Sequence, residues 1–184
     1  MKFKEIYKSL EGINGWMGEV DCACLNDYAS RVSGTIVEIG CFMGRSSKVL
    51  SLSTEAQVHS CDPFGGYEWG GEMWSKEKTK ELCLKNMEGI KNWHLHHMPS
   101  LELAKKWDKP IDLLFIDGAH DKYSVLDDTR AWMPFLKPNH FVLYHDYGCV
   151  TLEGVKEAVD FLNYEASYDF YYKGYKSCIK ICRK

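Results

Sequence analysis

The stretch IDLLFIDG at residues 111–118 decides the fold, because an almost unbroken apolar run stops there at an aspartate and a glycine. Short apolar runs of this kind are typical of parallel strands that are covered on both faces. Comparable stretches are TIVEIG at 35–40, QVHSCDP at 57–63, WHLH at 93–96 and FVLYHD at 141–146. Segments with helical spacing of apolar residues separate them, so the pattern predicts an α/β fold with a Rossmann-like doubly wound sheet.

The end of the chain predicts one antiparallel feature in this mostly parallel sheet. Residues 168–172 and 177–182 are β-rich and are joined through Gly174, so we expect a hairpin at the C-terminal edge. The expected organisation is one domain over residues 1–184, with an N-terminal helical segment at 1–33 and the Rossmann-like core at 34–184.

Local signals suggest where two of the helices begin and end. Pro134 and Pro138 are expected to close the helix that begins near Lys122, because proline lacks the backbone donor a helix needs. Ser100 is expected to cap a short helix after the strand at 93–96. Asp127 and Asp128 are expected to lie together on a solvated helix face.

Composition excludes several classes of protein. The 184 residues carry 23 Lys and Arg against 26 Asp and Glu, a net charge of −3, which argues against an electrostatic nucleic-acid binder. No apolar run approaches the roughly 20 residues of a membrane span, and residues 1–8 lack the apolar core of a secretory signal. The sequence therefore predicts a cytoplasmic protein without a membrane or nucleic-acid partner. Its eight cysteines form no CxxC pair and are expected to be reduced and structural.

Ligands of a doubly wound sheet bind beyond the carboxyl ends of its strands, and the first such end is glycine-rich. Gly40 and Gly44 frame a turn before a helix, but their spacing is neither GxGxxG nor a Walker A loop. The turn beside Glu38 suits a ligand with an amine and hydroxyls, unless it is a plain strand-to-helix turn. Asp62 follows Gly40 by 22 positions, where nucleoside-binding sheets hold ribose hydroxyls. An ordinary Asp-Pro turn is the alternative; together, the two features favour a nucleoside ligand.

These segments resemble a known family. VEIGCFMGRSS, CDPFGG, IDLLFIDGAHDKY and LKPNHFVLYHDY, in this order, are similar to class I S-adenosylmethionine-dependent methyltransferases. The resemblance is greatest to a small-molecule O-methyltransferase branch with an IDGxHxY motif, which includes macrolide-sugar O-methyltransferases, and it covers roughly residues 16–162. Asn139-His140 stands where relatives usually carry Gly-Gly, and asparagine tolerates the left-handed conformation.

The resemblance implies a set of cofactor-binding residues. Glu38, Gly40 and Gly44 would surround the amino-acid part of S-adenosylmethionine, Ser46 would reach its carboxylate, Asp62 would bind the ribose, Met98 and Ser100 would flank the adenine, and Asp117 would stand near the sulfonium and the acceptor.

Acidic residues at neighbouring strand ends suggest a metal site. Asp117 and Asp146 could together hold Mg²⁺, which prefers oxygen ligands, and the resemblance implies a divalent cation that orients acceptor hydroxyls. His145 occupies a position where some relatives carry another oxygen ligand, and histidine favours transition metals. The two carboxylates could instead shape the acceptor site without metal. His120, just beyond Asp117, is the candidate general base.

The sequence thus predicts an enzyme that methylates a hydroxyl of a small molecule, such as a sugar or another polyhydroxylated metabolite. A non-catalytic S-adenosylmethionine- or nucleoside-binding module and an NAD-dependent oxidoreductase are the alternatives. The Gly- and aromatic-rich loop at 64–75 is expected to be either a lid or a packing or dimer contact, and a homodimer is considered because the short chain leaves little room for an acceptor domain. His94, His96 and His97 are not assigned to a metal, since no third ligand is evident on one face.

Overall fold

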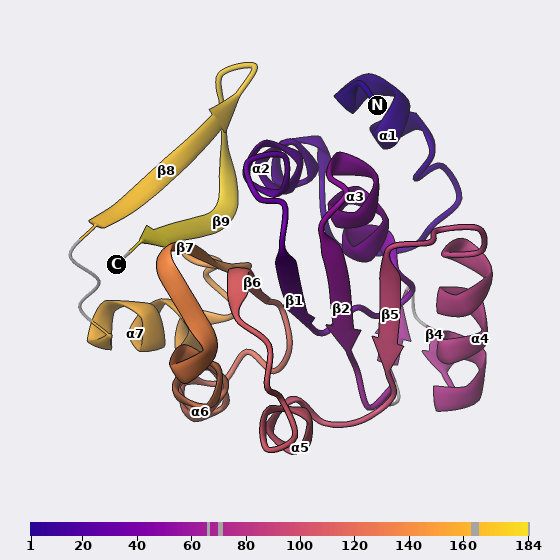
Figure 1. Ribbon diagram of the computed structural model, residues 1–184. Helices are drawn as coiled ribbons and strands as arrows, with labels where there is room; N and C mark the ends of the chain where they lie inside the picture. Colours follow the sequence, from indigo (N-terminus) through magenta and orange to yellow (C-terminus); the bar gives the residue numbers. More distant parts are fainter. Residues whose placement is uncertain (66, 70–71, 163–165, 184) are drawn as a thin grey trace.

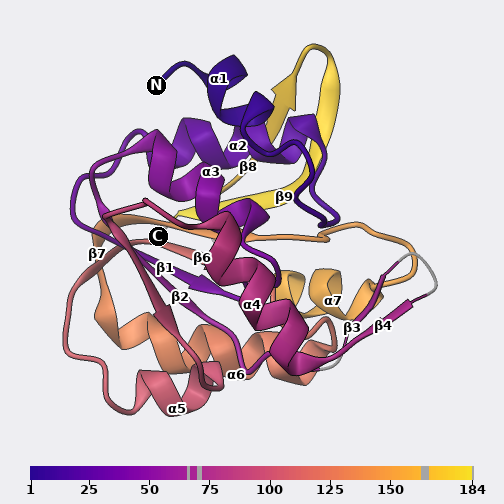
Figure 2. The same cartoon turned by 90° about the vertical axis from the view of Figure 1, so that its right-hand side faces the viewer.

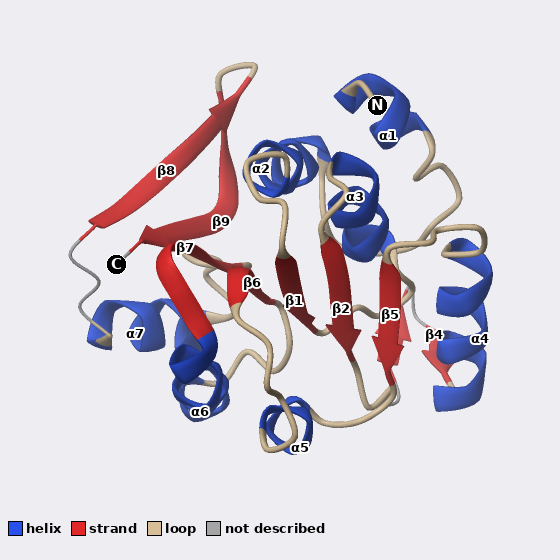
Figure 3. Ribbon diagram, viewed as in Figure 1, coloured by secondary structure: helices blue, strands red, loops and turns tan. Residues whose placement is uncertain are grey.

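The computed structural model describes residues 1–65, 67–69, 72–162 and 166–183. Its elements are α1 (Phe3–Lys8), α2 (Glu19–Ala29), β1 (Thr35–Ile39), α3 (Arg45–Ser53), β2 (Gln57–Cys61), β3 (Tyr67–Trp69), β4 (Glu72–Trp74), α4 (Lys76–Asn86), β5 (Trp93–His96), α5 (Ser100–Ala104), β6 (Ile111–Ile116), α6 (Lys122–Trp132), the 3-10 turn η1 (Met133–Phe135), β7 (Leu136–Tyr144), α7 (Glu153–Phe161), β8 (Ala166–Tyr172) and β9 (Tyr175–Arg183). Figure 1 traces them along the chain and Figure 3 separates helices from strands.

The core is a seven-stranded sheet in the order β5-β2-β1-β6-β7-β9-β8. The first five strands of this order are parallel, and β9 pairs antiparallel with both β7 and β8. The expected Rossmann-like sheet with an antiparallel C-terminal hairpin is therefore confirmed. β3 and β4 form a separate two-stranded hairpin within the segment 64–75, which was expected to be a loop.

Helices cover both faces of the sheet, as Figure 2 shows. One apolar cluster joins α1, α2 and α3 to alternate residues of the strands, such as Ile36 and Phe115. A second cluster joins α5, α6 and α7 to the intervening residues, such as Val37 and Leu114. This alternation follows from the pleat, which turns successive side chains to opposite faces. Both faces are buried, which explains why the central strands are almost uniformly apolar.

The prediction for Pro138 was wrong. The helix α6 ends at Trp132, Pro134 lies in the turn η1, and Pro138 lies inside the long strand β7. The strand tolerates proline there because the ladder between β6 and β7 is irregular, with Ile111 opposite Leu136 but Leu113 opposite Phe141.

Asn139 lies inside this irregular segment of β7. Its φ is +63°, so asparagine adopts the left-handed conformation that was expected where relatives carry glycine. Its neighbour His140 is buried, with Nδ1 at 2.6 Å from the carbonyl oxygen of Lys137.

The segment between α1 and α2 is fastened to the carboxyl end of the sheet by Arg45. Its Nε donates to the carbonyl of Met17 at 3.0 Å, and its Nη1 donates to the carbonyls of Ile13 at 2.9 Å and Leu10 at 3.2 Å. Residues 10–17 therefore lie beside the glycine turn that precedes α3. Within the described residues, no helix combines the length and the apolar character that crossing a bilayer requires.

Candidate functional site

A cavity of about 990 Å³ opens at the carboxyl ends of β1, β2, β6 and β7, together with the start of α5. Most of the residues singled out from the sequence line it: Gly40, Ser46, Asp62, Ser100, Asp117, His120, His145 and Asp146. Three others do not. Glu38 is fully buried beneath the loop, Gly44 is the N-cap of α3, and Met98 packs against the core cluster of α5 and α6.

The glycine turn allows β1 and β6 to approach each other closely. Gly40 has φ +83°, and a Cβ on it would lie 2.1 Å from the carbonyl oxygen of Asp117. No side chain fits in this space, so the turn requires glycine for packing as well as for conformation.

Glu38 lies directly under this turn and is completely buried. Its Oε2 accepts hydrogen bonds from Ser47, at 2.5 Å, and from Ser60, while Oε1 has no partner. Burial raises the pKa of Glu38 to about 7 despite these hydrogen bonds. A buried oxygen without a donor is costly, and the hydroxyl of Ser46, which lines the cavity, also lowers the pKa of this carboxyl.

Asp62 shapes the turn as well as lining the cavity. Its Oδ2 accepts the backbone amides of Cys41 at 3.0 Å and Phe42 at 2.9 Å, and its Oδ1 accepts that of Phe64 at 2.7 Å. These bonds hold the ends of β1 and β2 together. The same carboxylate also lines the cavity.

The prediction that Ser100 caps a helix was wrong, and so was the one that placed Asp128 on a solvated face. Pro99 is the N-cap of α5, and Ser100 is its first residue. The Ser100 hydroxyl donates to Oδ1 of Asp128 at 2.5 Å and accepts from the indole nitrogen of Trp132 at 2.9 Å. Asp128 is only 7% exposed and lines the cavity, and burial raises its pKa to about 6. Asp127 is exposed, as expected.

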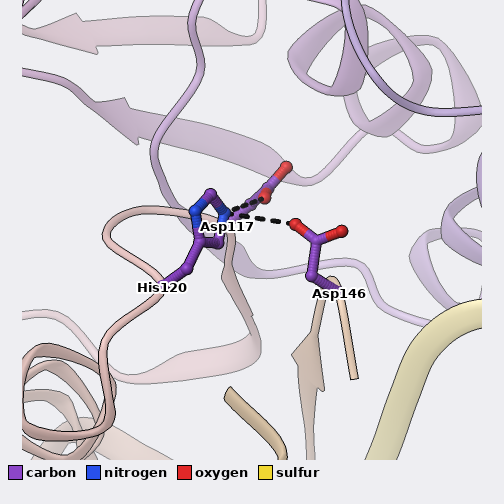
Figure 4. A group of neighbouring side chains, drawn as sticks. All are labelled: Asp117, His120 and Asp146. Atoms are coloured by element: carbon purple, nitrogen blue, oxygen red, sulfur yellow. Dashed lines mark ion pairs between the residues drawn. The ribbon is translucent and has the colours of Figure 1, made fainter. Parts of the chain in front are cut away.

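Three side chains converge at the ends of β6 and β7 (Figure 4). Nε2 of His120 lies 3.1 Å from Oδ2 of Asp146 and 3.8 Å from Oδ1 of Asp117. Their ligand atoms lie within 4.8 Å of one another, which suits a metal ion. The carboxylates of Asp117 and Asp146 raise the pKa of His120 to about 9, so without another cation the imidazole is protonated at neutral pH.

Asp146 holds its position in an unusual backbone conformation. Its φ is +59°, the left-handed region that costs a non-glycine residue roughly 1–3 kcal/mol. Strain of this kind is concentrated at functional sites. Burial would raise the pKa of Asp146, but hydrogen bonds from His120 and His145 lower it far below its usual range.

His145 lies behind this group, buried between two sets of carboxylates. Its Nδ1 is 3.0 Å from Oδ2 of Asp146 and 3.2 Å from Oδ1 of Asp117, while Nε2 is 4.0 Å from Oδ2 of Asp21. Burial would lower the pKa of His145, but these carboxylates raise it well above its usual value. The sequence predicted a metal site of Asp117, Asp146 and His145. His145 contacts both acids, but the group whose ligand atoms lie close enough to share a metal is Asp117, His120 and Asp146.

Asp21 was not predicted to contribute to the site. Its Oδ1 accepts from the hydroxyl of Ser177 and the amide of Cys178, both at 2.8 Å, which brings α2 and β9 together next to His145. The sequence offered one signal for Asp21: it is an acidic residue among the apolar residues of α2 that are buried in the structure. The sequence holds no indication of the partner 156 residues away.

The histidines of β5 belong to a different cluster from the site. His59 of β2 faces His94 in register, and its Nδ1 lies 3.0 Å from Nε2 of His96. Burial lowers the pKa of His59 to about 3 and also lowers that of His96. These rings pack as neutral side chains against Trp107, and within the described part of the chain they are not among the groups that could hold a metal.

The eight cysteines all lie in the described part of the chain and are free thiols, as expected. Cys41 and Cys83 approach most closely, with their sulfurs 3.9 Å apart beneath the glycine turn. The hydrogen bond with the Cys83 thiol and burial keep the pKa of Cys41 well above its usual value, which makes it a structural residue rather than a nucleophile.

Comparison with known proteins supports the fold and the family. The family model described as "Methyltransferase domain" matches residues 37–147, which include both the glycine turn and the Asp117–Asp146 group. The chain is also 28% identical over 116 residues to an uncharacterized protein of Sinorhizobium fredii. That match spans 60% of this chain but only 13% of the length of the relative.

Solved structures with the same fold include two O-methyltransferases. The enzyme TomG of Streptomyces achromogenes, involved in tomaymycin synthesis and solved with S-adenosylmethionine, has a TM-score of 0.70 at 16% identity, covering 98% of this chain and 88% of its own. An O-methyltransferase of Bacillus cereus, solved with S-adenosylhomocysteine, has a TM-score of 0.70 at 14% identity, covering 99% of this chain and 90% of its own.

One detail of the expected motif is wrong, because IDGAHDKY places two residues between His120 and Tyr123, and IDGxHxY has one.

Proposed function

The chain belongs to the methyltransferase-domain family, and we propose that it transfers the methyl group of S-adenosylmethionine to a hydroxyl oxygen of a small molecule. One observation carries this proposal. The Asp117, His120 and Asp146 group lines the same cavity as the glycine turn and Asp62, so a bound cofactor and a proton acceptor would meet there.

The residues beneath and around the turn fit this cofactor. Oε1 of Glu38 is a buried acceptor without a donor, and S-adenosylmethionine carries an ammonium group on its amino-acid part. Asp62 lines the cavity at the end of β2, within reach of a ribose bound there, and Ser46, in the first turn of α3, lies where the helix dipole favours a carboxylate. We assign Glu38, Gly40, Gly44, Ser46, Asp62 and Asp117 to cofactor binding on these grounds. When bound, the cofactor supplies an electrophilic methyl group on a positively charged sulfur.

The chemistry of the chain's own residues is alignment and proton removal. In its deprotonated form, the minor form at neutral pH because its pKa is about 9, His120 would take the proton of an acceptor hydroxyl as the oxygen attacks the methyl carbon in line with the departing sulfur. The carbon–oxygen bond forms as the carbon–sulfur bond breaks, which leaves a methyl ether and S-adenosylhomocysteine. Asp117 and Asp146 hold the imidazole at this position, and they also stabilise the imidazolium that results.

A divalent cation fits the same group as an alternative arrangement, in which His120 would be a ligand and not the base. Asp117, Asp146 and His120 present two carboxylates and one imidazole, and His145 adds a nitrogen that contacts both acids. This mixed set favours Mn²⁺ or another transition metal over Mg²⁺, which prefers oxygen ligands alone. A cation there would orient acceptor hydroxyls and favour their ionised form.

Calorimetric titration tests the cofactor. We expect S-adenosylmethionine and S-adenosylhomocysteine to bind with micromolar affinity, and Asp62→Asn to weaken both by tenfold or more, since the amide loses charge and one acceptor. Asp108→Asn is the matched control. Asp108 is exposed and precedes β6, so it lies near the amino ends of the strands and not at the carboxyl ends, where the cavity opens. Thermal melting of each variant confirms that it is folded.

Methyl transfer is then measured with labelled cofactor and a panel of sugars, catechols and other polyhydroxylated acceptors, with and without Mn²⁺ or Mg²⁺. Turnover that is lost in His120→Ala supports the proposal. Absence of cofactor binding under every condition would contradict it. Binding without transfer to any acceptor would favour a non-catalytic binding module.

A further inference from the structure

This inference rests on the proposed function and concerns His145, which takes no part in the proton transfer proposed above. Its side chain is only 4% exposed and lies behind the group of Asp117, His120 and Asp146. Its backbone amide donates to the carbonyl of Ile116 at 3.1 Å, which fixes the residue at the ends of β6 and β7. The ring therefore has a set position beside the two carboxylates.

The two imidazoles share the same carboxylate oxygens. Nδ1 of His145 lies 3.0 Å from Oδ2 of Asp146 and 3.2 Å from Oδ1 of Asp117. Nε2 of His120 approaches the same two oxygens, at 3.1 Å and 3.8 Å. Asp117 and Asp146 are also the carboxylates that a divalent cation would need. A cation bound there would therefore meet Nδ1 of His145.

The contacts of His145 are those of a hydrogen-bond donor and not those of a metal ligand. An ionised carboxylate only accepts hydrogen bonds, so Nδ1 carries the hydrogen that its two contacts require. A histidine that binds a metal usually donates its other ring N–H to a carboxylate, a carbonyl or water. Nε2 of His145 is buried and has no hydrogen-bond partner in the described part of the chain. Oδ2 of Asp21, at 4.0 Å, lies beyond hydrogen-bond distance.

We propose that the Nδ1–H of His145 bridges Asp117 and Asp146 where a divalent cation would otherwise bridge them, so that this chain binds such a cation weakly and transfers methyl groups without one. The bridge keeps both carboxylates beside His120. A cation that binds here must displace the hydrogen from both oxygens, and hydrogen bonds to a charged group are stronger than neutral ones. The arrangement in which His120 is the base follows from this bridge.

The test titrates Mn²⁺ alone into the full chain by calorimetry and compares the wild type with His145→Leu. Leucine fills a similar volume but neither donates a hydrogen bond nor binds a metal. We expect the variant to bind Mn²⁺ at least tenfold more tightly, because hydrogen bonds to the carboxylates no longer oppose the cation. A ligand role predicts the reverse, since leucine would remove a ligand. Affinity in the wild type that equals or exceeds that of the variant would overturn the proposal.

His140→Leu is the matched control. His140 is also a buried histidine and lies within β7, but its Nδ1 faces the carbonyl oxygen of Lys137. Its loss should leave the affinity for Mn²⁺ unchanged, which would show that removal of a buried imidazole alone does not create the gain.

The wild type alone provides a second measurement should His145→Leu not fold. Addition of about 1 mM Mn²⁺ should raise its melting temperature by less than about 2 °C relative to a chelator, because a cation near or below its Kd adds little stability. A larger rise would overturn the proposal.

The outcomes separate this inference from the proposed function. If the wild type binds Mn²⁺ as tightly as His145→Leu or more tightly, the role of His145 fails, but binding of S-adenosylhomocysteine to the same chain would still support the proposed function. Turnover by the wild type should stay within twofold when a chelator is added, and a greater loss would overturn the inference alone. If S-adenosylhomocysteine does not bind, the proposed function fails, and the claim about methyl transfer fails with it.

Discussion

Replacing Gly40 by alanine tests whether the close approach of β1 and β6 is as strict as the structure indicates. The new Cβ would lie 2.1 Å from the carbonyl oxygen of Asp117, 2.7 Å from its carbonyl carbon and 3.0 Å from Cα of Gly118. Carbon and oxygen atoms that are not bonded rarely approach closer than about 3.2 Å, well inside the van der Waals optimum. The two strand ends would therefore have to separate by about 1 Å.

The expected cost has two parts. Alanine at φ +83° costs about 1–2 kcal/mol. Separation of β1 and β6 also weakens the backbone hydrogen bond from Asp117 to the carbonyl of Ile39 at 2.8 Å, and the shift of Gly40 distorts its bond to the carbonyl of Cys61 in β2 at 2.9 Å. Each contributes about 1 kcal/mol, so the free energy of unfolding should fall by about 3–4 kcal/mol in total.

Gly89→Ala is the matched control. Gly89 has φ +81° but nothing lies within 4 Å of an added Cβ. Alanine there should lower the free energy of unfolding only by the conformational cost, about 1–2 kcal/mol. Urea unfolding of both variants, followed by circular dichroism, measures the difference. A loss of stability in Gly40→Ala within 1 kcal/mol of the loss in Gly89→Ala would refute the reasoning, because it would show that the ends of β1 and β6 separate freely.

Three further predictions concern single side chains. His120→Ala should lower kcat about 10²–10⁴-fold while the affinity for S-adenosylhomocysteine stays unchanged. The rate of methyl transfer by the metal-free wild type should increase as the pH rises toward the His120 pKa of about 9. A rate that does not change with pH would contradict a base role. The folded pKa of His59, about 3, lies below its unfolded value of about 6.5, so the unfolded chain binds more protons and stability should fall by about 2 kcal/mol from pH 7 to pH 5. Urea titrations at both pH values should show less of this loss in His59→Phe, and an unchanged loss would count against the assignment. Arg45→Met should speed amide exchange in residues 10–17 by tenfold or more, because three carbonyls lose their donor, whereas Arg31→Met, at an exposed ion pair, should not.

The sequence predicts the central strands well, because their apolar runs and the residues that end them are local signals. The stretches ending at Gly40, Asp62 and Asp117 become β1, β2 and β6 with the expected bounds. Pro138 shows where local reasoning fails. Proline breaks a helix or a regular ladder, but an irregular pairing of β6 and β7 accepts it, and that irregularity depends on a neighbouring strand.

The candidate site is predictable only in part for the same reason. Asp117, His120 and Asp146 lie at strand ends that the topology brings together, so their convergence follows from the fold. Asp128 looks like half of a solvated pair of acids in the sequence. Its partner is Ser100, which comes from another part of the chain and which also accepts from Trp132 of the same helix α6. The histidines of β5 likewise acquire a partner, His59, from the neighbouring strand.

The contact between Asp21 and the strand β9 has a consequence for how the protein is made. The partners of Asp21, Ser177 and Cys178, are added to the chain more than 150 residues after it. A nascent chain that has not yet exposed β9 lacks the antiparallel neighbour of β7, the strand that precedes His145 and Asp146. Closing so long a loop is slow, so the site should be among the last parts of the molecule to assemble. An unfinished chain on the ribosome would then have most of the sheet and no working chemistry.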